Sequence, residues 1–111
     1  MPLVVALLDQ RNLAGIGNVY ACELAFLAGL DPHTPIGQAP DLERLVRRAH
    51  LLLDANKERV SRIITGQRRN PTWVYGRRDC LRCGTPTHTD DIGRAGHERH
   101  TWWCPSCQPP L

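Results

Sequence analysis

The sequence predicts a mostly α-helical bundle that is followed by a small β-hairpin module. Three observations lead to this fold class. Apolar residues recur at helical spacing through the first 66 residues, a polar and basic stretch ending in proline follows, and the last third has two Cys-x2-Cys pairs among strand-like runs. We therefore divide the chain into a helical module over 1–66, a linker over 67–73 and a hairpin module over 74–111.

A glycine-rich turn separates the first two predicted helices. The apolar spacing of Leu3–Leu13 indicates a short helix that stops at Gly15. Gly15 and Gly17, two glycines within three positions, are typical of a tight turn with a sparsely allowed backbone conformation. A second helix then begins at Asn18, whose side chain is placed to cap it, and ends before Gly29.

A long amphipathic helix is predicted for the rest of the helical module. The segment His33–Pro40 has no period and is rich in proline and glycine, so we expect a loop there. Asp41 follows as a predicted helix cap. An apolar stripe then continues at helical spacing to about Gly66, with most of the basic side chains lying off the stripe.

Composition limits the size of the core and the kind of partner. At 111 residues, the chain has the size of one domain or of two small modules. Only 5% of residues are aromatic, so a small C-terminal module needs support beyond hydrophobic burial. The net charge of +3 permits a nucleic-acid partner but does not establish one. The longest apolar run, Leu3–Leu8, is too short to span a bilayer and lacks a basic flank, so we expect a cytoplasmic protein.

Four of the five cysteines form two pairs whose spacing is typical of a metal site. In a reducing compartment, cysteines are better explained as metal ligands or free thiols than as disulfides. Two cysteines separated by two residues can bind one tetrahedral metal after a tight turn, and a second pair completes the shell. The predicted ligands of a structural zinc ion are Cys80, Cys83, Cys104 and Cys107.

Alternatives to this zinc site are a redox role for the pairs or a ligand set that includes histidine. The histidines between the pairs are His88, His97 and His100. Four thiolates already form a closed shell without a place for water or substrate, so we expect the zinc to stabilise the module and do no chemistry.

A hairpin is predicted between the two cysteine pairs. The runs His88–Asp90 and Thr101–Trp103 have strand-like composition, and Gly93–Gly96 supplies the turn. The simplest role for Trp102 and Trp103 is to cover the metal.

Two stretches resemble the formamidopyrimidine-DNA glycosylase and endonuclease VIII family of DNA-repair enzymes. The segment Leu7–Ala21, LLDQRNLAGIGNVYA, is similar to the helix-two-turns-helix motif of that family. The residues Val74–Arg77, VYGR, together with the cysteine pairs and the R-x-T-x-x-C-P-x-C-Q ending at Arg99–Gln108, resemble its zinc finger. The run Trp73–Tyr75 is similar to the endonuclease VIII branch in actinobacteria. The resemblance implies a helix-two-turns-helix bundle followed by a β-hairpin zinc finger.

The resemblance assigns DNA contacts to Gly15, Gly17, Asn18 and Arg99. Backbone N–H groups in a glycine-rich turn that leads into a helix form an anion site. By resemblance, Asn18 and this turn contact the backbone phosphate beside the damaged nucleotide; the alternative is that Asn18 only caps its helix. Arg99 would project from the hairpin tip, bind phosphate and, as a catalytic residue, assist the final elimination of the sugar.

The implied activity is that of a bifunctional DNA glycosylase and abasic-site lyase that removes oxidised bases in base-excision repair. The family's nucleophile is an N-terminal proline followed by a glutamate, whereas Pro2 is followed here by Leu3. We therefore regard Pro2 as a coincidence. We expect the DNA-binding part of such an enzyme, as a fragment or a truncated reading frame, and leave open whether this chain is itself an enzyme.

The expected partner is double-stranded DNA with a damaged or abasic site, bound by a monomer with one zinc ion near the bacterial nucleoid. Two other functions stay open at this point. One is a non-catalytic zinc-ribbon protein that binds or scaffolds other proteins. The other is a stand-alone lyase that uses the amine of Pro2 or of a lysine.

Overall fold

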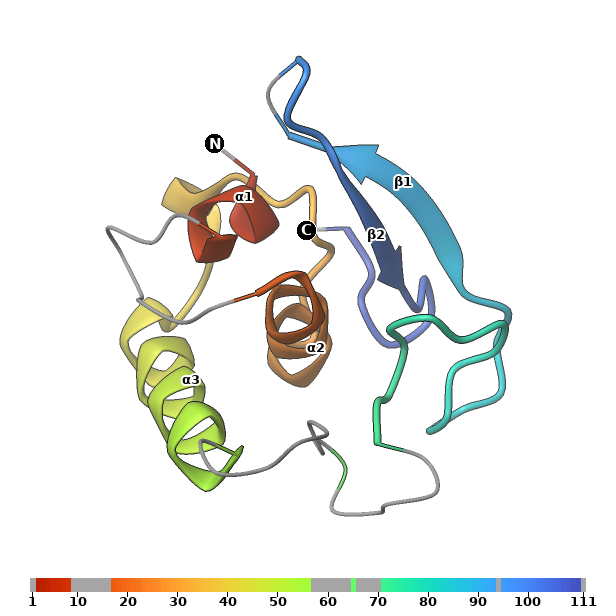
Figure 1. Cartoon of the computed structure of the whole chain (residues 1–111), viewed down its shortest axis with the longest axis horizontal. Helices are drawn as coiled ribbons and strands as arrows, with labels where there is room; N and C mark the ends of the chain where they lie inside the picture. Colours follow the sequence, from red (N-terminus) through yellow and green to blue (C-terminus); the bar gives the residue numbers. More distant parts are fainter. Residues whose placement is uncertain (1, 9–16, 57–64, 66–70, 94, 111) are drawn as a thin grey trace.

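The computed structural model describes residues 2–8, 17–56, 65, 71–93 and 95–110. Within these ranges it has α-helices followed by a two-stranded antiparallel sheet, which confirms the predicted order of helices and hairpin (Figure 1). None of the described helices has the length and apolarity needed to cross a membrane. The elements in chain order are α1 (Leu3–Leu8), α2 (Asn18–Ala28), the 3-10 turn η1 (Ile36–Gln38), α3 (Leu42–Asn56), β1 (His88–Ile92) and β2 (Arg99–Trp103).

Helix α2 is the central element of the fold. It packs against α1, α3 and β2, and Figure 1 shows it between α3 and the hairpin. Every residue from Tyr20 to Phe26 is consequently buried, whereas the sequence suggested a single apolar stripe. A helix with neighbours on several sides loses the polar face that a surface helix has. The burial of α2 therefore includes one charged side chain, Glu23.

Two expectations from the sequence are wrong at the N-terminus of α2. Gly17 is the N-cap residue and Asn18 is the first helical residue, so the prediction that Asn18 caps the helix is wrong. Gly17 has φ −101° and ψ 178°, which is ordinary extended backbone, so it does not supply the sparsely allowed conformation that we expected. Gly15 lies outside the described residues. At the other end, Gly29 has φ 69° and ends the helix as predicted.

The boundaries of the other two helices follow from their caps. The carbonyl of Pro2 accepts hydrogen bonds from the first turn of α1, so this half-buried proline begins a helix. Asp41 caps α3 as predicted, because its Oδ1 accepts a hydrogen bond of 3.3 Å from the backbone N–H of Arg44. The predicted continuations, over 9–13 in the first helix and over 57–64 and Gly66 in the third, lie outside the described residues.

Strands β1 and β2 form the predicted hairpin with slightly longer strands. Their register pairs His88 with Trp103 and Ile92 with Arg99. At the turn, a Cβ atom on Gly93 would lie 3.1 Å from a backbone carbonyl oxygen, and this residue has φ 144°. Glycine is therefore required at the point where β1 ends.

Glu23 connects α2 to the segment that leads into the hairpin module over 74–111, which carries the four paired cysteines and which we call the cysteine module. The side chain is fully buried, and its carboxylate accepts backbone hydrogen bonds from Trp73, Val74 and Tyr75. Burial raises the pKa of Glu23 above its usual value, and the three backbone N–H donors oppose this rise. The indole of Trp73 also stacks on Phe26 of α2, with ring centroids 5.6 Å apart. A segment about fifty residues away in the chain is thus fixed to the central helix.

Replacing Glu23 with glutamine tests the importance of this contact. E23Q leaves only one oxygen acceptor and places an amide N–H against a backbone N–H donor. We expect the free energy of unfolding of the metal-loaded protein to fall by about 2–3 kcal/mol, measured by urea denaturation. The matched control is Glu43→Gln on the exposed first turn of α3. Equal stability of E23Q and the control would contradict the structure.

Candidate functional site

The four cysteines of the two pairs come together at one point. Their Sγ atoms all lie within 4.8 Å of one another, and they form the only such candidate metal group among the described residues. The Sγ of Cys83 is 3.5 Å from that of Cys104 and 3.6 Å from that of Cys107. No histidine belongs to this group. The arrangement matches the predicted ligand set and can bind a metal ion.

A tight turn positions the first cysteine pair. After the first pair, the N–H of Gly84 donates to the carbonyl of Cys80 at 2.9 Å, and Gly84 has φ 77°. The hydroxyl of Thr85 lies 3.1 Å from Sγ of Cys83, and hydrogen bonds with Thr85 are the largest cause of a lowered pKa of that thiol, about 6. This shift favours the thiolate of Cys83, which is the form that binds metals.

Arg82 lies between the cysteine group and α2. Its guanidinium carbon is 4.6 Å from the ring centroid of Phe26. A hydrogen bond with Cys107 raises the pKa of Arg82 above its usual value. Four thiolates around a divalent ion have a net negative charge, so this arginine supplies a positive charge where one is needed.

The second cysteine pair is joined to α2 by Gln108. This side chain is fully buried, and its Oε1 accepts a 2.9 Å hydrogen bond from the N–H of Cys104. Its Nε2 donates to the carbonyl of Leu30, just beyond the end of α2, also at 2.9 Å. One amide therefore satisfies both a backbone donor of the cysteine turn and a backbone acceptor of the helical part.

The hairpin also contacts the N-terminal end of α2. The Nδ2 of Asn18 donates a 2.8 Å hydrogen bond to the carbonyl of His100. His100 follows Arg99, the first residue of β2, whose side chain is exposed. The structure thus places Asn18 directly against the strand that carries Arg99. Gly15 lies outside the described residues and cannot be compared.

The two adjacent tryptophans differ in position. Trp102 packs against the cluster that includes Cys80 and Cys104, in agreement with the idea that it covers the metal site. Trp103 instead has its ring edge-on to His33, at 4.9 Å, and to His88, at 5.7 Å. Alternation along a strand explains the difference, because neighbouring residues point to opposite faces of the sheet.

Sequence reasoning missed three residues that join the parts of this site: Glu23, His33 and Gln108. Each has a partner far away in the chain, in two cases beside a local one, so no local spacing reveals the connection. A weak signal existed for Glu23, which interrupts an otherwise apolar stretch of its helix. Gln108 directly follows the last cysteine, where a polar side chain can hydrogen-bond the turn that carries the second cysteine pair.

Comparison with known proteins agrees with the geometry. No family model matches the chain. It is 53% identical over 107 residues to a probable endonuclease 8 2 of Streptomyces coelicolor, a match that spans 93% of this chain and 39% of that protein. The structure is similar to the MutM (Fpg) protein of Thermus thermophilus, with TM-score 0.77, 33% identity, and coverage of 99% of this chain and 46% of that one.

A further similar structure is a Lactococcus lactis Fpg (MutM) complex with DNA that contains FAPY-dG. Its TM-score is 0.74 at 29% identity, over 93% of this chain and 40% of that one. The chain is therefore similar in sequence and fold to the C-terminal part of formamidopyrimidine-DNA glycosylase and endonuclease 8 proteins. Among these proteins, the 53% identity to the Streptomyces protein favours the endonuclease VIII branch. The chain spans less than half the length of these relatives.

Replacing Gln108 with leucine tests the contact between the cysteine turn and α2. Q108L keeps a similar volume but leaves the N–H of Cys104 and the carbonyl of Leu30 buried without partners. We expect the free energy of unfolding to fall by about 2–4 kcal/mol, measured by urea denaturation with metal present. Gln38→Leu, at an exposed glutamine of η1, is the control and should change stability little. A Q108L protein as stable as Q38L would show that the hydrogen bonds of Gln108 to Cys104 and Leu30 do not stabilise the fold.

Proposed function

We propose that the chain is the DNA-binding part of a base-excision-repair DNA glycosylase and abasic-site lyase that removes oxidised bases. It binds damaged duplex DNA through backbone phosphates. The observation that carries the proposal is the hydrogen bond between Asn18 and the carbonyl of His100. It brings the start of α2 and the strand that begins with Arg99 to one place, so that both can contact the same stretch of DNA.

The N-terminus of α2 has the properties of a phosphate site. The helix begins without a side-chain cap, and its N-cap residue is Gly17. Among the described residues, none has an atom within 4 Å of where a Cβ atom at Gly17 would lie, so none of them blocks an incoming group there. The unpaired N–H groups and the dipole of a helix N-terminus favour an anion. The Asn18 amide has two hydrogens, and the one that His100 does not use is available to a phosphate oxygen.

Arg99 is the second proposed phosphate contact. Its guanidinium is exposed at the start of β2, next to the turn of the hairpin. A guanidinium can bind phosphate with two parallel hydrogen bonds and keeps its charge at any pH at which DNA is stable. By its family resemblance, Arg99 also assists the elimination of the sugar after the base is removed. Gly15 completes the proposed DNA-binding set.

The proposed cofactor is one structural zinc ion bound by the four clustered cysteines. A tetrahedral zinc with Zn–S bonds of ~2.3 Å has sulfur atoms about 3.8 Å apart. The measured separations of 3.5 and 3.6 Å from Cys83 to its neighbours are close to this value. Thiolates are also the ligands that zinc prefers in closed structural sites. Zinc would fix the two cysteine turns, while the chain's own contacts orient them on α2.

The proposed organisation is a helix-two-turns-helix module over 1–66, a linker over 67–73 and a zinc finger over 74–111. The protein acts as a monomer in the bacterial cytoplasm, where its partner is double-stranded DNA. Support comes from the DNA in the similar Lactococcus lactis complex.

Metal analysis tests the cofactor. We expect one zinc ion per chain, and its loss from Cys104→Ser with collapse of the dispersed NMR signals of β1 and β2. Cys22→Ala is the control: burial raises the pKa of the Cys22 thiol to about 11, so it is a neutral core side chain rather than a ligand. Retention of a full zinc equivalent by Cys104→Ser would overturn the assignment.

The dependence of DNA affinity on salt tests the phosphate contacts. For a duplex with an abasic-site analogue, Asn18→Ala and Arg99→Ala should each flatten the plot of log K against log salt by ~0.9. Arg47→Ala is the control, because this exposed arginine lies on α3, across α2 from the hairpin (Figure 1). Slopes that stay unchanged in both variants reject the contacts. Absence of duplex binding by the zinc-loaded parent protein favours a non-catalytic scaffold instead.

A further inference from the structure

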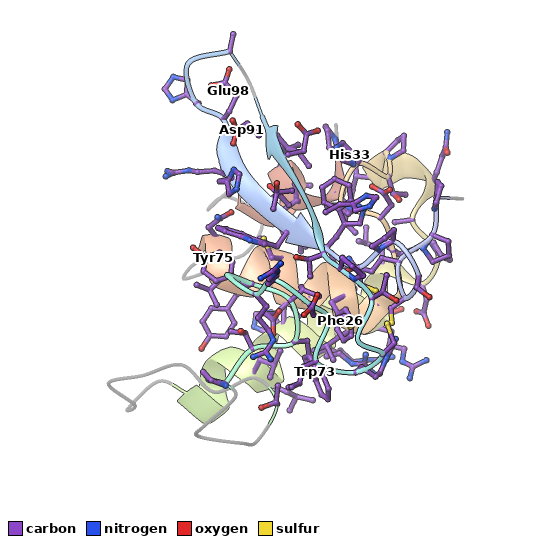
Figure 2. All side chains as sticks on the ribbon, turned by 90° about the vertical axis from the view of Figure 1, so that its right-hand side faces the viewer. Phe26, His33, Trp73, Tyr75, Asp91 and Glu98 are labelled. Atoms are coloured by element: carbon purple, nitrogen blue, oxygen red, sulfur yellow. The ribbon has the colours of Figure 1, made fainter. Side chains whose placement is uncertain are left out.

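His33 joins the helical part of the protein to the hairpin through two carboxylates. It lies in the segment that follows α2, and its Nδ1 is 2.7 Å from Oδ1 of Asp31. Its Nε2 is 2.7 Å from Oδ2 of Asp90, in the middle of β1. The ring is also edge-on to Trp103 of β2. Figure 2 shows His33 beside the hairpin. We call Asp31, His33 and Asp90 the histidine bridge.

The geometry of the histidine bridge specifies a protonation state. A neutral imidazole has one N–H donor and one acceptor nitrogen, whereas an ionised carboxylate only accepts. Both ring nitrogens of His33 face carboxylate oxygens, so both need a hydrogen. An imidazolium between two carboxylates satisfies this geometry. Burial lowers the pKa of His33, but the hydrogen bonds to Asp90 and Asp31 outweigh it and raise the pKa above its usual value.

The two sides of the histidine bridge are anchored to different parts of the fold. On the helical side, Thr34 follows His33 and its carbonyl accepts a 2.7 Å hydrogen bond from the N–H of Leu3 at the start of α1. On the hairpin side, Asp90 pairs in register with Thr101 of β2, two residues from Arg99. The histidine bridge therefore connects the start of α1 to the pair of strands that includes Arg99.

We propose that His33 is a positioning residue for the phosphate site: as an imidazolium it fixes the hairpin to the helical part, and DNA binding weakens when it loses its proton. The DNA part of this inference rests on the proposed function. The imidazolium does not, because it is inferred from the contacts of the His33 ring.

Few other charged groups face His33 among the described residues. Asp31 comes from its own segment and Asp90 from β1, while His88 of β1 contacts the same tryptophan ring as His33. The sequences of α1 and η1 contain no ionisable side chain. Asp90 also interacts at longer range with His100. A comparison with a His33 variant separates the effect of His33 on DNA affinity from the effects of these other histidines.

The sign of the pH effect follows from the raised pKa. A protonated His33 is favoured more in the folded protein than in the unfolded chain. The bridge therefore contributes fully to stability below the pKa of histidine in the unfolded chain. Its contribution is lost as the pH rises through the higher pKa of His33 in the folded protein.

An NMR titration of the ring protons in the zinc-loaded protein tests the bridge directly. We expect a pKa for His33 above that of a histidine in the same protein unfolded in denaturant. Asp90→Asn should lower the His33 pKa toward the value in the unfolded chain, whereas Asp91→Asn should change it less, because Asp91 is paired with His100 instead. A His33 pKa in the folded protein at or below that of the unfolded chain overturns the inference, whatever the protein binds.

The affinity for a duplex with an abasic-site analogue tests the effect on DNA binding. Between pH 6 and pH 8.5 at constant salt, the zinc-loaded parent protein should lose roughly threefold to fivefold more affinity than His33→Gln. The two proteins should converge at high pH, where the side chain at position 33 is uncharged in both. His50→Gln, at an exposed histidine of α3, is the control and should keep the parent's pH dependence. Identical pH profiles for the parent and His33→Gln contradict the inference, and absence of DNA binding at every pH contradicts the proposed function while the NMR test still stands.

Discussion

The buried carboxylate of Glu23 is the contact on which the rest of the structure depends. It accepts three consecutive backbone N–H groups, from Trp73 to Tyr75, inside a helix that is covered on several sides. A buried carboxylate is costly unless donors surround it, and donors of this kind are available only when the segment adopts one conformation. Glu23 therefore selects a single way for the cysteine module to lie on α2. Gln108 adds a second fixed point at the other cysteine pair.

These fixed points explain how a small chain orients the proposed DNA-binding residues. The cysteine cluster and the two-stranded sheet have little apolar area of their own, so they need both a metal and a firm attachment to the helices. Once the sheet lies on α2, its second strand passes the start of that helix, where Asn18 meets the carbonyl of His100. The proposed phosphate contacts thus come from distant parts of the sequence that the fold brings together. The histidine bridge adds a second contact between the helical part and the hairpin.

What the sequence predicted and what it missed have a common physical explanation. The cysteine pairs, the hairpin strands and the cap at Asp41 depend on partners within a few residues, or on a spacing that chemistry fixes, and the structure confirms them. Asn18 was assigned a local role as a helix cap, whereas its side chain has a partner 82 residues away. The partners of Glu23 and the Leu30 partner of Gln108 are similarly distant, so these contacts depend on tertiary packing that no local pattern encodes. Residue roles taken from family resemblance, such as that of Arg99, stay predictions.

The central claim is that the cysteine module and α2 form one cooperative unit. Native-state hydrogen exchange of the zinc-loaded protein measures this most directly, because the N–H groups of Val74 and Cys104 are hydrogen-bonded to the side chains of Glu23 and Gln108. We expect these two amides to open with the same free energy as the amide of Leu24 in the middle of α2. Exchange of Val74 and Cys104 at a much lower free energy than Leu24 would show that the module opens on its own and would contradict the account.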